Sequence, residues 1–243
     1  MKRIIFLFLL LTLSWALPKM AVVIDDCGYA LEHLPAFTEL EYPLTLAVIP
    51  GQAYSRASAA EIKKAHKALL IHFPWPPFGR DAKRKYPIRI EQGATTANIV
   101  WMLEQAVASV PSADGVNNHM GSVLSRDQVM LDKFMQILSE HPENFYFLDS
   151  HTIQNSLALR TALQHGILAV RNDIFLDGEQ TESVIERRFR EAVTVAEKYG
   201  TVVAICHANR PVTRKVLKNL LKKYNGRVEF VLLPEIMLER LKR

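Results

Sequence analysis

The stretch MAVVIDDCGY, residues 20–29, places two neighbouring carboxylates at the end of an apolar run. Residues 20–24 are apolar and rich in β-branched side chains, a pattern that predicts a short buried strand. Asp25 and Asp26 follow this run, and Gly28 then allows the chain to turn. Neighbouring carboxylates repel each other and resist joint ionisation. The pair therefore raises the question of what holds two like charges where a buried strand meets its loop.

Similar apolar runs recur along the chain and alternate with segments of helical spacing. One such segment is residues 181–200, where Ile185, Phe189 and Val193 share a face and Gly200 is placed to end the helix. Regular alternation of strand and helix predicts an α/β fold with a parallel sheet. About eight strands in one domain fit a βα-barrel or a partial barrel. The predicted strands are residues 20–24, 44–49, 68–73, 115–118, 145–148, 168–170, 202–206 and 228–232.

The first 16 residues, MKRIIFLFLLLTLSWA, differ from the rest of the 243-residue chain. Lys2 and Arg3 precede a continuous apolar run, and Ser14 and Ala16 stand at small-residue cleavage spacing, as in a secretory signal peptide. The apolar run is shorter than the roughly 20 residues that a membrane-spanning helix needs. An uncleaved anchor is the alternative. We therefore expect a signal peptide at 1–16, one domain at 17–243, and an exported protein of the periplasm or cell envelope.

Charge and cysteine content exclude several classes of protein. The net charge of +5 falls to +3 without Lys2 and Arg3, which is weak evidence about partners. No zinc-finger or RNA-recognition signature is present, so we do not expect a nucleic-acid ligand. Two cysteines are too few for a disulfide scaffold or a four-cysteine zinc site. Cys27 comes shortly after the predicted strand 20–24, and Cys206 ends the predicted strand 202–206. Two alternatives stay open for this pair: a disulfide at the ends of the two strands, or two buried thiols.

Polar side chains collect where the predicted strands end. In barrels the active site forms at the carboxyl ends of the strands, so these residues are expected to meet. One carboxylate and two imidazoles among them, Asp26, His72 and His119, suit Zn²⁺ or a similar ion and leave a position open for water. A hydrogen-bonded core histidine at position 72 and a structural polar turn at position 119 are the alternatives. The strand-end residues are Asp25, Asp26, His72, Asn117, Asn118, His119, Asp149, His151, Asp173, Asp177 and His207.

Five segments together resemble the divergent branch of the polysaccharide deacetylases, over nearly all of residues 20–233. The resemblance implies a distorted, incomplete βα-barrel that hydrolyses a non-peptide C–N amide bond, removing N-acetyl groups from a glycan. Carried over by position, it implies Asp25 as general base, Asp26 and His72 as metal ligands, and His207 as general acid. The segments are VVIDDCGY (22–29), LLIHFPW (69–75), GVNNHMGS (115–122), FLDSHT (147–152) and RNDIFLD (171–177).

The sequence departs from the main deacetylase pattern at the second metal histidine. The main family has both histidines in one segment, H-x-x-x-[ST]-x-x-H, whereas His72 is followed by FPWPPFG. We therefore predict His119 as the third ligand of a divalent metal, Zn²⁺, with no organic cofactor. Asp149 and Asp173 are both possible counterparts of the family's aspartate–tryptophan motif. With Asn118 they are the residues predicted to support the site.

Two functions remain open from the sequence. The first is a metal-dependent hydrolase acting on an N-acetylated envelope glycan. The second is a non-catalytic exported protein that binds a glycan or a partner protein through the barrel cleft, which the altered ligand pattern favours. Retention of Asp25 and His207 favours the hydrolase, because binding alone needs neither a base nor an acid. Phosphate-ester hydrolysis is disfavoured, because DDCGY is not D-x-D-x-T and no G-x-x-x-x-G-K-[ST] loop is present. The sequence does not identify a protein partner.

Overall fold

The computed structural model describes residues 16–79 and 86–242. The predicted signal peptide, apart from Ala16, lies outside the described residues. Within the described ranges, no helix is both long and apolar enough to cross a membrane.

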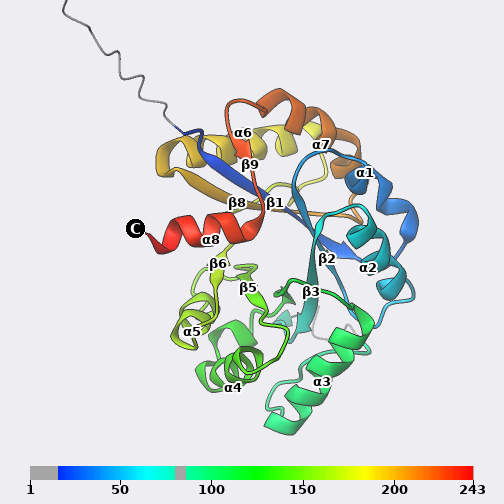
Figure 1. Cartoon of the computed structure of the whole chain (residues 1–243), viewed down its shortest axis with the longest axis vertical. Helices are drawn as coiled ribbons and strands as arrows, with labels where there is room; N and C mark the ends of the chain where they lie inside the picture. The colour runs from blue at the N-terminus through cyan, green and yellow to red at the C-terminus, as the bar shows by residue number, and fades with distance from the viewer. Residues whose placement is uncertain (1–15, 80–85, 243) are drawn as a thin grey trace, which may run out of the picture.

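The strands form one curled parallel sheet that stops short of a closed barrel, which confirms the predicted fold class (Figure 1). The strand order is β6-β5-β4-β3-β2-β1-β8-β7, and β9 pairs with β1 at its start. In the described part of the chain the two ends of this order, β6 and β7, do not pair, so the sheet is open between them. The strands are β1 (Lys19–Cys27), β2 (Leu44–Val48), β3 (Ala68–Trp75), β4 (Gly115–Met120), β5 (Tyr146–Asp149), β6 (Ala169–Arg171), β7 (Ile174–Phe175), β8 (Thr201–His207) and β9 (Glu229–Phe230).

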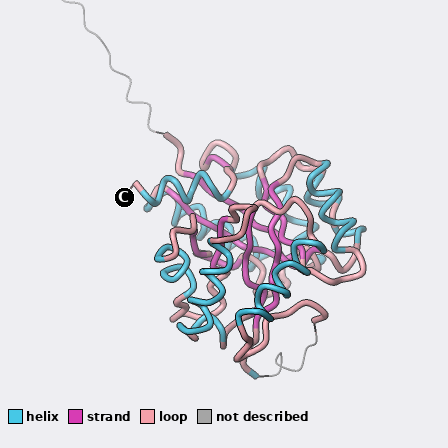
Figure 2. Tube along the Cα trace, turned by 60° about the horizontal axis from the view of Figure 1, so that its bottom comes forward, coloured by secondary structure: helices cyan, strands magenta, loops and turns pink. Residues whose placement is uncertain are grey.

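Helices cover the outside of the sheet, so that the strands lie enclosed by them (Figure 2). Local signals set several helix ends: the side chains of Thr95 and Asp127 accept backbone N–H bonds at the starts of α3 and α4. Gly200 ends α6 with a φ of 80°. The helices are α1 (Pro35–Thr38), α2 (Ser55–Lys64), α3 (Thr96–Ser109), α4 (Gln128–Ser139), α5 (Ala158–Gln164), α6 (Glu182–Tyr199), α7 (Pro211–Tyr224) and α8 (Leu233–Leu241), with 3₁₀ turns at Leu31–His33 and Leu124–Arg126.

Alternation along the strands divides the core into two layers. In β1, Met20, Val22 and Ile24 belong to the large core between the sheet and the outer helices. Ala21 and Val23 belong to a smaller core on the concave side of the sheet. Helix α8 fills that concave side with Leu233, Ile236 and Met237, and it contacts β1, β6 and β8. The last helix therefore closes the interior of the incomplete barrel.

The concave layer changes from apolar to polar along the strands. On β1 the inward positions run from Ala21 and Val23 to Asp25, and on β3 they run from Leu70 to His72. On β8 the inward residue Ile205 is followed by His207. Because successive side chains of a strand alternate between faces, these polar residues point into the barrel at its carboxyl end. The fold thus places the candidate site opposite the end that α8 fills.

Candidate metal and catalytic site

A β-bulge in β1 brings both aspartates to the site. Simple alternation would direct Asp26 to the outer face, away from Asp25. The β1–β2 register breaks between Ile24 and Cys27, and Asp26 has a φ of 61°, in the left-handed region. A bulge inserts an extra residue and re-aims side chains. The Asp26 carboxylate is thereby turned toward His72 and His119, while Asp25 keeps its inward direction.

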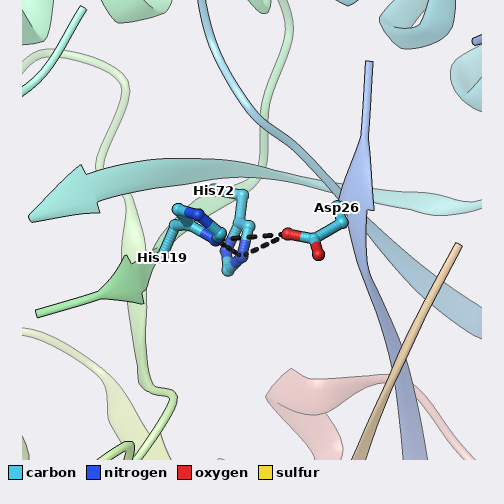
Figure 3. A group of neighbouring side chains, drawn as sticks. All are labelled: Asp26, His72 and His119. Carbon is cyan, nitrogen blue, oxygen red and sulfur yellow. Dashed lines mark hydrogen bonds and ion pairs between the residues drawn. The ribbon is translucent and has the colours of Figure 1, made fainter. Parts of the chain in front are cut away.

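Asp26, His72 and His119 converge from three strands on one point (Figure 3). The Oδ1 atom of Asp26 lies 3.2 Å from Nδ1 of His119 and 3.5 Å from Nε2 of His72. These two nitrogen atoms are 3.0 Å apart. Within residues 16–79 and 86–242 this is the one cluster of acidic, histidine or cysteine side chains with metal-ligand geometry. The structure therefore brings together the three residues predicted as metal ligands.

The dimensions of this triangle fit a tetrahedral metal ion. Zinc bonds to nitrogen and oxygen of about 2.0–2.2 Å imply ligand atoms roughly 3.3–3.5 Å apart. The three observed separations are close to these values. The Oδ1 atom of Asp26 is also buried without a hydrogen-bond donor among the described residues. A buried carboxylate oxygen with no donor, facing two imidazole nitrogens, is the arrangement that a cation would complete.

Hydrogen bonds orient both imidazoles toward that point. Nδ1 of His72 lies 2.9 Å from Oδ1 of Asn117, so Nδ1 carries the proton and Nε2 is left free to bind. Nε2 of His119 lies 2.8 Å from the hydroxyl of Tyr86, so its Nδ1 faces the cluster. The amide nitrogen of Asn117 donates to Oδ1 of Asp25 over 2.9 Å, which fixes the orientation of the amide. Such partners raise ligand basicity and metal affinity.

The two aspartates have pKa values displaced in opposite directions. Burial raises the pKa of Asp25, and the charges of His72 and His207 and the Asn117 hydrogen bond offset this only in part. Burial also opposes ionisation of Asp26, but its contacts with His119 and His72 outweigh it and hold the pKa well below the ordinary range. Asp26 is therefore a permanent anion, whereas Asp25 has the greater affinity for a proton. Environments that separate two carboxylates in this way assign them different roles.

His207 is paired with a buried carboxylate that the sequence did not identify as its partner. Its Nδ1 lies 2.7 Å from Oδ1 of Asp177, and Oδ2 of Asp177 accepts from the backbone N–H of His207 and the hydroxyl of Thr213. Burial lowers the pKa of His207, but the hydrogen bond and charge of Asp177 outweigh it and raise the pKa to about 9. The ring of Phe175 lies parallel to His207, with centroids 6.1 Å apart. His207 is therefore protonated at neutral pH and held in one orientation.

These groups share a cavity of about 300 Å³ at the carboxyl end of the sheet. Asp25 and His207 are paired neighbours on β1 and β8. The cavity places Asp25, His207 and two of the candidate metal ligands, His72 and His119, against one small volume. It is lined by Asp25, His72, Pro77, Phe78, Asn118, His119, Met120, Ser122, Ser150, Thr152, Phe175 and His207.

The residues predicted to support the site have different positions. Asn118 lines the cavity. Its side-chain oxygen accepts a hydrogen bond from the Ser150 N–H, and its side-chain nitrogen donates one to the Met120 carbonyl. Asp149 accepts hydrogen bonds from the Ser156 hydroxyl, from the His151 N–H in the loop after β5, and from the Leu159 N–H at the start of α5.

The structure does not bring Asp173 to the site. Its carboxylate accepts the Val203 N–H and pairs with Arg240 of α8. Val203 lies four residues before His207 on β8, toward the end of the barrel that α8 fills. Asp173 therefore anchors the last helix rather than supporting the catalytic groups.

Asn117 and Asp177 have central places that the sequence analysis did not assign. The sequence placed both residues at the ends of predicted strands but gave neither of them a role. Alternation on β4 gives Asn117 the same face as His119, so strand periodicity alone could have selected it. Asp177 follows the two-residue strand β7, which is too short to stand out as an apolar run. Tyr86 carried no such signal, because its contact with His119 depends on the path of a loop.

Cys27 and Cys206 are both free and buried, so the structure contains no disulfide between them. Burial raises the pKa of each thiol well above its ordinary value, and the charges of nearby aspartates add to this effect. The two residues are inert members of the outer core.

Comparison with known proteins identifies the family. The sequence pattern of the divergent polysaccharide deacetylases matches residues 22–237. The protein belongs to this family. The matched range includes the three candidate metal ligands, and it also includes Asp25 on β1 and His207 on β8.

Two curated relatives of this family member come from bacteria. The chain is 34% identical over 202 residues to the uncharacterised protein YibQ of Escherichia coli K12, covering 83% of this chain and 62% of that protein. It is 33% identical over 223 residues to an uncharacterised protein of Haemophilus influenzae, covering 90% of this chain and 76% of that one. The chain thus spans less than two thirds of the Escherichia coli protein.

Solved structures share the fold of this family member at low sequence identity. An uncharacterised protein from Agrobacterium tumefaciens C58 superposes with a TM-score of 0.84 at 20% identity, covering 92% of this chain and 90% of that one. A peptidoglycan deacetylase from Bdellovibrio bacteriovorus superposes with a TM-score of 0.54 at 12% identity, covering 90% of this chain and 53% of that one. The deacetylase fold is therefore present, in a variant closer to the Agrobacterium protein.

Proposed function

We propose that the protein is a metal-dependent hydrolase that removes N-acetyl groups from an envelope glycan. The observation that carries the proposal is the position of Asp25. Its Oδ1 atom is held by Asn117, while Oδ2 lies 3.6 Å from Nε2 of His72, beside the candidate metal point. A buried carboxylate with a raised pKa next to a three-ligand cluster is what a general base needs and what simple binding does not. Peptidoglycan deacetylases with the same fold support the choice of substrate class.

Asp26, His72 and His119 would hold a divalent ion, and their nitrogen and oxygen atoms favour Zn²⁺. When bound, such an ion supplies Lewis-acid polarisation of an amide carbonyl and makes water more acidic. The low pKa of Asp26 keeps this ligand anionic without competition from protons. Asn117 binds Nδ1 of His72 and Tyr86 binds Nε2 of His119, so that Nε2 of His72 and Nδ1 of His119 are the atoms that face the cluster.

Asp25 takes the proton of the attacking water at Oδ2, since Oδ1 is engaged by Asn117. The same Asn117 amide joins this base to the ligand His72, so the two keep a fixed separation. His207 donates a proton from Nε2 to the departing amine, because its Nδ1 proton is committed to Asp177. Protonation is required here because an amine anion is a poor leaving group. Phe175 supports the imidazole from one side.

Acetate release from N-acetylated glycans tests this function directly. Purified protein loaded with zinc is expected to release acetate from N-acetylglucosamine oligomers or from peptidoglycan. A chelator should abolish the release, and added zinc should restore it. Stoichiometric bound metal with no acetate from any N-acetylated glycan would instead support the non-catalytic alternative, a protein that binds glycan through the cleft.

The pH dependence of the rate should depend on Asp177. His207 must be protonated to act as an acid, so kcat/KM is expected to fall as pH rises through the pKa of His207, which is about 9 without bound metal. A cation nearby lowers that value by repulsion. Asp177→Asn removes the charge that raises the pKa, so the alkaline limb should move toward neutral pH. A pH–rate profile of both proteins measures this, and an unmoved limb would show that another group is the acid.

Export completes the proposal, because an envelope glycan is reached only outside the cytoplasm. The basic start and the apolar run of residues 1–16 support it. Sequencing the N-terminus of the protein recovered from the cell envelope would test it, since cleavage should leave a chain that begins near Leu17.

A further inference from the structure

A second cavity of about 600 Å³ adjoins the catalytic cavity, and Phe78 lines both. It lies between the loop after β3 and the start of α4. The catalytic cavity, at about 300 Å³, is at the lower limit for a small-molecule site and holds about one sugar ring. A polymeric substrate must therefore extend beyond the catalytic cavity. Phe78 forms the wall between this cavity and the second one. The second cavity is lined by Phe78, Gln92, Val123, Arg126, Asp127, Gln128 and Val129.

Phe78 is held in an exposed position. Its side chain is 53% exposed although it is a large apolar group. Its backbone N–H donates to the hydroxyl of Ser122 over 2.8 Å, and the N–H of Val123 donates to the carbonyl of Pro76 over 3.1 Å. Two bonds therefore fasten the loop after β3 to the turn after β4. The exposed ring has a defined place at the rim of the catalytic cavity.

Arg126 packs on this ring with its hydrogen-bonding capacity unused. Its guanidinium carbon lies 4.9 Å from the centroid of Phe78. Among the described residues, no carboxylate or carbonyl accepts a hydrogen bond from this side chain. A guanidinium offers five N–H donors, and stacking on an aromatic ring leaves them directed outward in its plane. The neighbouring Gln128, by contrast, already bonds Asp132 and Thr161.

An exposed aromatic ring beside a guanidinium that has no hydrogen-bond acceptor among the described residues is suited to a sugar ring. The C–H face of a pyranose packs on an aromatic side chain, and its hydroxyls accept hydrogen bonds from a guanidinium. We propose that Phe78 and Arg126 form a second sugar subsite, which binds the residue next to the one held in the catalytic cavity. The inference rests on the proposed function, and it makes the preferred substrate a polymer rather than a single sugar.

Chain-length dependence tests the subsite. Phe78→Ala and Arg126→Ala are each expected to lower kcat/KM on an N-acetylglucosamine tetramer by about 3- to 10-fold, in line with one aromatic contact. With Arg126→Ala, activity on the methyl glycoside of N-acetylglucosamine should change less than about twofold, because Arg126 lines only the second cavity. Trp101→Ala is the matched control: this aromatic is 58% exposed on α3 and lines neither cavity. Equal losses on both substrates with Arg126→Ala, or no loss on the tetramer with either variant, would overturn the proposal.

Binding separates a failed subsite from a failed activity. Calorimetry with the zinc-loaded Asp25→Asn variant should give tighter binding of the tetramer than of the methyl glycoside. The addition of Phe78→Ala should remove that advantage. If this result is obtained while the wild type releases no acetate, the subsite stands and the hydrolase does not. If the tetramer binds no more tightly than the methyl glycoside, or neither binds, the subsite is overturned whatever the activity.

Discussion

Asp25→Asn is expected to lower the rate of acetate release by about 10²–10⁴-fold, the usual cost of losing a general base. The replacement has the same shape and can keep the bond from Asn117 to its side-chain oxygen. It removes the oxygen atom that accepts the proton. Zinc content should remain that of the wild type, because Asp26, His72 and His119 are untouched. Parallel measurements of initial rate and of metal by mass spectrometry check both statements.

Thermal unfolding distinguishes this result from a damaged fold. Burial raises the pKa of Asp25, so above its folded pKa the ionised carboxylate destabilises the metal-free protein. The neutral amide is therefore expected to leave the Tm at pH 7 unchanged or higher. Asp132→Asn, which alters a half-exposed carboxylate on α4, is the matched control and should keep full activity. Undiminished acetate release by Asp25→Asn would exclude Asp25 as the base.

His119→Ala is expected to reduce bound zinc from near one ion per chain to near zero and to abolish acetate release. Two ligands remain after the substitution, and catalytic zinc sites use three protein ligands. Asp26→Ala and His72→Ala should have the same effect. The measurement is metal content after dialysis against a weak chelator, together with the acetate assay. His151→Ala is the matched control, since this histidine does not line the cavity, its side chain bonds the carbonyl of Gln154, and its backbone bond to Asp149 survives the substitution.

Asn117→Ala should give a graded version of the same result. Asn117 does not belong to the ligand cluster but orients His72, and loss of such a partner commonly weakens metal binding by about 10–100-fold. A zinc titration against a competing dye measures the difference between the variants. Retention of stoichiometric, tight zinc in His119→Ala would refute the three-ligand site. It would also return His119 to the role of a structural turn residue.

Much of the fold could be predicted from the sequence because its signals are local. Each long strand coincides with an apolar run, and the alternation with helices of 3.6-residue periodicity identifies a parallel α/β sheet. Asp25, His72 and His207 could be placed at one end of that sheet, since parallel strands carry their carboxyl ends to the same edge. The divergent deacetylase resemblance drew on these same strand ends, and the family match agrees with it.

Tertiary structure decided how those residues are used. Alternation alone would have turned Asp26 outward, and the bulge that redirects it depends on pairing with β2, which local sequence does not reveal. His207 is paired with Asp177 because Asp177 follows β7, which lies beside β8 in the sheet. Asp173 does not belong to the site, because the last helix, α8, folds into the barrel and its Arg240 forms an ion pair with the Asp173 carboxylate.

The fold explains how two neighbouring carboxylates share one strand end. The sequence by itself determined that two carboxylates stand at the end of a buried strand. Only the fold gave them different surroundings: two imidazoles from distant strands lower the pKa of Asp26, and burial raises that of Asp25. Hydrophobic periodicity is a property of neighbouring residues, whereas the electrostatic environment of a buried group is set by contacts between residues far apart in the chain.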